Sequence, residues 1–124
     1  MVSPATPGDS PYGPLSDEPD DNRFLLPDGF HSRRVVGAGE EVGDTGFVFP
    51  VFPDGAGTVG TTDGGWILVV NSEVFEVDAP DAGSVTALTF SDDGSVVSAR
   101  SILSGSRSNC GGSMTPWGTW LSCE

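Results

Sequence analysis

The residues best suited to chemistry lie close together at the C-terminal end of the chain. Its only two cysteines, Cys110 and Cys123, fall within the last fifteen of the 124 residues, and Glu124 follows Cys123 directly. A cysteine thiolate is a good ligand for a transition metal, whereas carboxylate oxygens suit calcium. A metal centre is therefore one interpretation. A buried free cysteine, or a bridge between Cys110 and Cys123, is the other, and composition alone favours it.

Glu73 is a further candidate ligand, because it stands two residues after Asn71, at the end of an apolar run that predicts a buried strand. A carboxylate at the end of a core strand can bind calcium, and a solvated loop carboxylate is the alternative. His31 is the only histidine, and its spacing to the cysteines does not match that of a zinc site. The chain has no Gly-x-Ser-x-Gly elbow and no convincing Ser-His-Asp set, so nucleophilic hydrolase chemistry is unsupported.

Glycine-rich stretches give a weaker signal. Gly55–Gly60 matches the pattern G-x-G-x-x-G, but a dinucleotide site needs a helix to begin directly after it, and here a turn and a strand follow. The motif predicts a glycine-rich connector rather than a nucleotide site. Asp63-Gly64-Gly65 and Asp92-Asp93-Gly94 lack the alternating oxygen ligands of a calcium loop and predict hairpin turns.

The elements that must position these residues are all strands. Trp66–Asn71 is apolar on both faces and predicts a fully buried strand. Ser84–Phe90 and Ser95–Leu103 flank an Asp-Gly turn and predict a hairpin. The other expectations are a strand over Phe30–Val36, an edge strand or loop over Gly46–Phe52, a loop over Ser104–Ser113 and a last strand from about Thr119. The fold class is therefore all-β.

Four strands in order, followed by a strand of a new sheet, are typical of one β-propeller blade and the start of the next. A β-sandwich produces similar spacing and stays open as an alternative. We expect residues 1–22, which are rich in proline and acidic residues, to form a flexible arm. We expect residues 23–124 to form an incomplete propeller domain, truncated inside a strand.

The charge of the chain limits the classes of molecule that it can bind. Five basic residues, all arginine, stand against 18 acidic ones, for a net charge of −13. Such a surface repels phosphate backbones and anionic lipid, which argues against nucleic-acid or membrane-surface binding. It suits either the binding of divalent cations or an environment of high salt. No apolar run is long enough to span a membrane, and no export signal is visible at the N-terminus.

The run N-C-G-G-S-M-T-P-W-G-T-W-L-S-C-E, residues 109–124, is similar to the signature of the PhoX-type alkaline phosphatase family. The similarity covers nearly the whole chain from about Tyr12. It includes Gly13–Leu15, Asn22–Arg33, Thr62–Trp66, Val70–Glu73, the hairpin and Ile102–Gly105.

The resemblance implies a six-bladed β-propeller of several hundred residues, monomeric and exported to the periplasm, cell surface or medium. It implies a phosphomonoesterase that requires calcium and iron and hydrolyses small phosphate esters. On the matching positions, Cys123 is the candidate iron ligand, Glu124 a metal ligand, Glu73 a calcium ligand and Asn109 a substrate contact. The metals would clamp the phosphate oxygens and present the nucleophile. This piece alone is expected to be inactive. A non-catalytic propeller module that binds calcium or a partner is the alternative function.

Overall fold

The computed structural model describes residues 10–75 and 82–124. The chain divides into two compact units, one up to Val35 and the other from Val36 onward. Strands are the only regular elements among the described residues, which confirms the all-β prediction. Consequently, this part of the chain contains no helix of the length and apolarity needed to cross a membrane.

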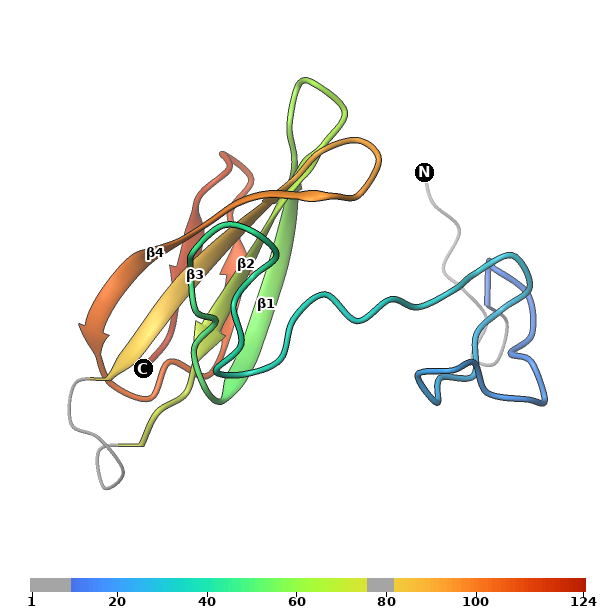
Figure 1. Cartoon of the computed structure of the whole chain (residues 1–124), viewed down its shortest axis with the longest axis horizontal. Helices are drawn as coiled ribbons and strands as arrows, with labels where there is room; N and C mark the ends of the chain where they lie inside the picture. The colour runs from blue at the N-terminus through green and yellow to red at the C-terminus, as the bar shows by residue number, and fades with distance from the viewer. Residues whose placement is uncertain (1–9, 76–81) are drawn as a thin grey trace. The chain divides into compact units, whose positions relative to one another are not determined.

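The second unit is built on a four-stranded antiparallel sheet, in which each strand pairs with the next along the chain (Figure 1). Its strands are β1 (Pro53–Gly60), β2 (Trp66–Ser72), β3 (Gly83–Phe90) and β4 (Val96–Ser106). The predicted buried strand is β2, which lies between β1 and β3, and the predicted hairpin is β3–β4. Only the second half of β2 is fully buried, because its first residues lie at the rim of the sheet.

A second, two-stranded sheet follows, made of β5 (Gly112–Met114) and β6 (Trp120–Ser122). The predicted last strand near Thr119 is therefore confirmed. The predicted Ser104–Ser113 loop is shorter at both ends, since β4 runs to Ser106 and β5 begins at Gly112.

Two other expectations are wrong. Phe30–Val36 forms no strand, and the glycine motif Gly55–Gly60 lies inside β1 rather than in a connector. Gly46–Phe52 forms the loop alternative, with one isolated bridge between Glu41 and Val48. Glycine is needed within β1 for a steric reason, because a Cβ at Gly57 would lie 2.7 Å from the Trp120 ring.

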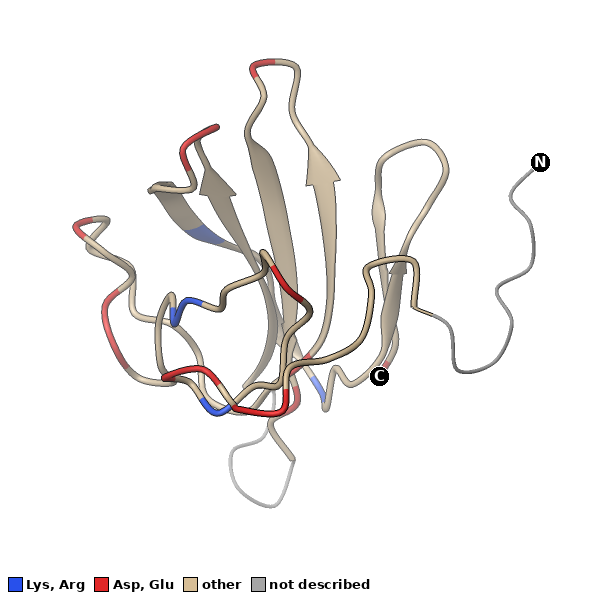
Figure 2. Cartoon of the chain, turned by 90° about the vertical axis from the view of Figure 1, so that its right-hand side faces the viewer, with Lys and Arg blue, Asp and Glu red and all other residues tan. Residues whose placement is uncertain are grey.

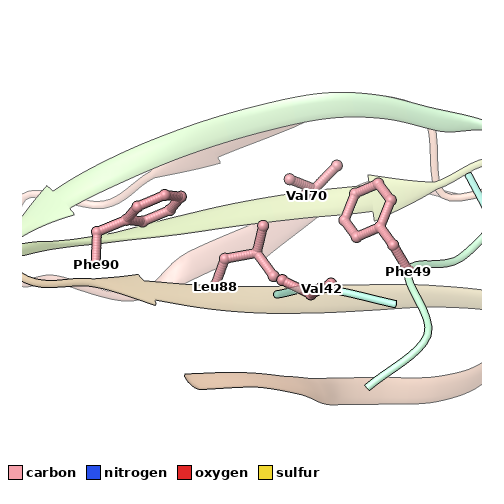
Figure 3. Packing of buried hydrophobic residues seen from close by; sticks show 5 residues of the cluster. All are labelled: Val42, Phe49, Val70, Leu88 and Phe90. Atoms are coloured by element: carbon pink, nitrogen blue, oxygen red, sulfur yellow. The ribbon is translucent and has the colours of Figure 1, made fainter. Parts of the chain in front are cut away.

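One face of the sheet carries the apolar core. Val70 of β2 and Leu88 and Phe90 of β3 pack with Val42 and Phe49 from the preceding loop (Figure 3). These residues alternate along β2 and β3, so they fall on one face. At the rim of this core, the Trp66 and Phe90 rings stack with 5.0 Å between their centroids.

The opposite face is covered by the β5–β6 hairpin. Val69 and Asn71 alternate with the core residues of β2 and therefore lie on this second face. Trp120 of β6 and Met114 of β5 reach over Gly57 of β1. The inner strands β2 and β3 are thus largely covered, by a loop on one face and a strand pair on the other, whereas β1 and β4 are mostly exposed.

The three hairpins share one turn geometry. In each turn the first residue donates its N–H to the fifth residue's carbonyl, and the fourth residue, a glycine, donates to the first. The three glycines have φ between +82° and +89° and are Gly64, Gly94 and Gly118. Because only glycine adopts this conformation without strain, the predicted turns at Asp63-Gly64-Gly65 and Asp92-Asp93-Gly94 are confirmed.

The first unit has its own polar centre at Asp20. The carboxylate of Asp20 accepts hydrogen bonds from the N–H groups of Asn22 and Phe24 and from the N–H and hydroxyl of Ser32. Residues 1–9 of the predicted arm lie outside the described residues. Asp20 therefore connects the described part of that arm to Ser32 within the same unit.

Substitution of a turn glycine tests this fold. Gly64→Ala should lower the free energy of unfolding by about 1 kcal/mol, because alanine is strained at φ +89°. Gly60→Ala is the matched control. A Cβ at Gly60 would meet nothing within 4 Å, so the urea denaturation midpoint of this variant should stay close to that of the unchanged chain. Equal midpoints for both variants would contradict the turn assignment.

Candidate functional site

A buried asparagine on the central strand organises the residues of the C-terminal motif. The side chain of Asn71 is completely buried on β2. Its amide nitrogen donates to the Gly111 carbonyl at 2.7 Å. Its amide oxygen accepts from the Trp120 indole N–H at 2.9 Å and from the Ser122 hydroxyl at 3.2 Å. Through these bonds Asn71 connects the four-stranded sheet to β6 and to Gly111, the residue just before β5.

Asn109, the predicted substrate contact, is the second buried amide of this network. Its nitrogen donates to the Ser122 hydroxyl at 2.9 Å, and its oxygen accepts from the Ser106 hydroxyl. The side chain is 1% exposed, and both ends of its amide are paired within the chain. Here it positions β6 relative to the end of β4, and its contact with substrate stays a prediction.

Cys123 is held by its backbone at the end of β6. Its N–H donates to the Gly111 carbonyl at 2.9 Å, and its own carbonyl accepts from the Cys110 N–H at 3.1 Å. Both cysteines are free thiols, Cys123 exposed and Cys110 half-buried. The backbone thus fixes the place of the Cys123 thiol while its side chain faces solvent.

Glu124 and Glu73 have different surroundings. A carboxylate oxygen of Glu124 accepts from the Arg107 N–H at 3.0 Å. Glu73 is half-buried, and its N–H donates to the Phe52 carbonyl at 2.9 Å. Within residues 10–75 and 82–124, no three His, Cys, Asp or Glu side chains gather into a group that could hold a metal ion. The structure therefore does not bring Cys123, Glu124 and Glu73 together as one set of ligands.

A shallow pocket of about 340 Å³ opens beside the network. Four apolar side chains and the Ser122 hydroxyl line it, from Val85 of β3, Ile102 and Leu103 of β4, and Trp120 and Ser122 of β6. It carries no charged group, so by itself it offers nothing to hold a phosphate.

Sequence reasoning missed Asn71, Trp120 and Ser122 as members of the site. A signal was present at Asn71, because an amide that ends an otherwise apolar strand must find partners when buried. Trp120 and Ser122 alternate with exposed Leu121, which places them on the covered side of β6. The spacing of residues in the sequence did not indicate that both side chains bond to Asn71 of the other sheet.

The acidic residues lie mostly on loops and turns rather than along the strands (Figure 2). Two of them have a clear electrostatic role in local structure. The Thr61 hydroxyl and then the Gly65 N–H hold the pKa of Asp63 below its usual value of 3.8. The Ser32 hydroxyl and then the Phe24 N–H lower the pKa of Asp20 in the same way. Both carboxylates stabilise turns of their own unit.

Comparison of the chain with family models, with curated proteins and with solved structures finds no match. The assignment of function therefore depends on the chain's own residues.

Removing the Asn71 side chain tests the network. Asn71→Ala should lower the free energy of unfolding by about 1–3 kcal/mol, because it leaves the indole N–H of half-buried Trp120 without its acceptor and removes one of the two donors to the Gly111 carbonyl. Thr86→Val is the matched control on the neighbouring strand. Thr86 is 1% exposed, and its hydroxyl has no hydrogen-bond partner among the described residues. Urea denaturation should show Thr86→Val unchanged or more stable. Equal losses in the two variants would contradict a special role for Asn71.

The pKa of Asp63 predicts a pH dependence. Because this pKa is lower in the folded chain, the unfolded chain binds more protons in acid, and the stabilisation is complete above pH 3.8 and lost as the pH falls through the folded pKa. Asp63→Asn should therefore flatten the fall of stability below that pH. Thr61→Val, which removes the main hydroxyl donor, should bring the Asp63 pKa back toward 3.8 in a carboxyl NMR titration. An unchanged titration would contradict this cause.

Proposed function

We propose that this chain belongs to a metal-dependent phosphomonoesterase of the PhoX type, built as a β-propeller. In this proposal β1–β4 form one blade and β5–β6 begin the next. The in-order antiparallel pairing of β1–β4 supports it, as does the packing of a separate strand pair across the face of that sheet. The proposal includes a monomeric, exported protein, in line with the resemblance of the C-terminal motif.

The observation that carries the proposal is the fixed position of two adjacent candidate ligands. Backbone hydrogen bonds to Cys110 and Gly111 hold Cys123, whose side chain is exposed. Glu124 follows, and its carboxylate is oriented by the Arg107 N–H. A thiolate is suited to a softer cation and a carboxylate to a harder one, and alternation directs these two neighbouring side chains to opposite sides of the strand end. Neither residue is used for the packing of the core.

These donors are too few to complete a metal site by themselves. The described residues supply no third ligand close to Cys123 and Glu124. We propose that iron and calcium are held jointly by these residues and by donors outside the described part of the chain, with Glu73 as a separate calcium ligand. When bound, the metals would neutralise phosphate charge. The chain's own contribution is to fix the strand that carries Cys123, through Asn71 and Asn109.

The charge of the chain supports a role for cations in substrate binding. With a net charge of −13 and arginine as its only basic residue type, the chain offers phosphate little direct attraction. Bound cations would reverse this locally, so that small phosphate esters bind through the metals. Nucleic acids, with their extended phosphate backbones, remain unsuitable partners.

Activity measurements on the complete gene product test the proposal. Hydrolysis of p-nitrophenyl phosphate should require iron and calcium and should be lost on treatment with a chelator. Cys123→Ser should lose bound iron and reduce turnover by at least about a hundredfold, since it removes a ligand. Cys110→Ser is the matched control and should keep both.

The alternative function, a non-catalytic module that binds calcium or a partner, gives a different outcome. A metal-loaded protein without turnover would favour that alternative and overturn the enzyme proposal. Retention of full iron content by Cys123→Ser would overturn the ligand assignment alone. The 124-residue chain by itself should be inactive in the same assay.

A further inference from the structure

The two cysteines lie opposite each other across the end of the β5–β6 ladder. The regular register ends with Gly112 opposite Ser122. Beyond it, the Cys110 N–H donates to the Cys123 carbonyl, and the Cys123 N–H donates to the Gly111 carbonyl. Two residues, Cys110 and Gly111, therefore oppose one, which is a β-bulge. Residues that face each other across antiparallel strands have Cα atoms about 4.5–5.5 Å apart, within the range of about 4.4–6.8 Å found for disulfides.

Alternation along β6 directs the Cys123 side chain away from the buried network. The Ser122 side chain faces the buried network, so Cys123, the next residue, faces away from it and is exposed. Asn109 is buried in the same network, and Cys110, which follows it between β4 and β5, is half-buried.

The glycines between Cys110 and β5 confirm this bulge geometry. A Cβ at Gly112 would lie 2.2 Å from the Trp120 ring, so Gly112 faces the covered side. A Cβ at Gly111 would meet nothing within 4 Å, so Gly111 faces the open side. Gly111 thus faces the side to which the Cys123 side chain points, and we infer that Cys110, half-buried beside it in the same bulge, approaches Cys123 from that side.

We propose that Cys110 and Cys123 form a reversible intramolecular disulfide on the outer side of the β5–β6 hairpin. The oxidant is a small disulfide such as oxidised glutathione. One thiolate attacks a sulfur of the glutathione disulfide and releases one reduced glutathione. The second thiolate attacks the resulting mixed disulfide and releases another. Two cysteine thiols are oxidised, one disulfide is reduced, and the two thiol protons are taken up by the departing glutathione thiolates.

The proposal stands whether or not Cys123 binds iron, because it depends only on the backbone of residues 109–123. If Cys123 is also an iron ligand, the two states exclude each other, since a sulfur in the disulfide no longer offers a thiolate. Oxidation would then release the metal, and bound metal would prevent the bridge by holding the Cys123 sulfur, while Cys110 stayed open to a mixed disulfide with glutathione.

An equilibrium with glutathione tests the pairing on the unchanged 124-residue chain. The reduced chain is incubated in buffers of reduced and oxidised glutathione, free thiols are trapped by alkylation, and the products are separated by mass. The same chain in denaturing urea is the matched control, because it closes a loop of the same length without the strand pairing. The effective concentration of one thiol at the other should be at least about tenfold higher in the folded chain. Cys110→Ser and Cys123→Ser should each give only the mixed disulfide with glutathione.

An effective concentration no higher in the folded chain than in urea would overturn the proposal, as would glutathione adducts at both cysteines or linkage only between chains. Iron binding separates this proposal from the proposed function. Suppose that the disulfide forms but the reduced complete product binds no iron. The disulfide proposal would then stand, and the assignment of Cys123 as an iron ligand would be overturned. If Cys123 binds iron but the metal-free chain forms no disulfide, the ligand assignment would stand and the disulfide proposal would be overturned.

Discussion

The burial of the Asn71 amide is the interaction on which the rest of this structure depends. An amide on the central strand of a sheet, taken completely out of water, must have partners for both of its ends, because an unpaired buried polar group is costly. Here the partners all come from the C-terminal motif, at Gly111, Trp120 and Ser122. The hairpin therefore has one position on the sheet in which these bonds form, and a shift of one residue would lose them.

This fixed position explains the distribution of small residues. The Trp120 ring fits over the second face because Gly57 and Gly112 carry no Cβ atom that would clash with it. The same requirement puts a glycine-rich motif inside a strand, where glycine has a cost in conformational entropy. The loss is offset by burial of the indole and by the indole N–H bond to Asn71. The other face needs no such space, and there Val42 and Phe49 pack on Leu88.

The outer side of the hairpin is left for chemistry. Cys123 is exposed there, Cys110 is half-buried opposite it, and Glu124 follows, while the acidic surface discourages anionic partners. A disulfide between the two cysteines would hold the ends of the hairpin together covalently. In the reduced chain, the Cys123 thiol is free to bind a metal. Both uses require the backbone of residues 109–123 to be rigid, and the Asn71–Asn109 network supplies that rigidity. The exposed apolar side chains of β4 and β6, Ile102, Leu103 and Leu121, lie outside the core.

By itself the sequence determined the all-β class, the central strand, the β3–β4 hairpin and the turns at Gly64 and Gly94, because these follow from local alternation and from the conformational freedom of glycine. It also singled out the motif that contains Cys123. It did not determine the strand character of Gly55–Gly60 or the absence of a strand over Phe30–Val36. Both depend on partners distant in the chain. The Trp120 ring leaves no room for a side chain at Gly57, and within residues 10–75 and 82–124 no strand pairs with Phe30–Val36. Only the tertiary structure decided that Asn71, Asn109 and Ser122 form one network and that the two cysteines oppose each other, since residues from 13 to 51 positions apart meet there through sheet register that spacing alone does not encode.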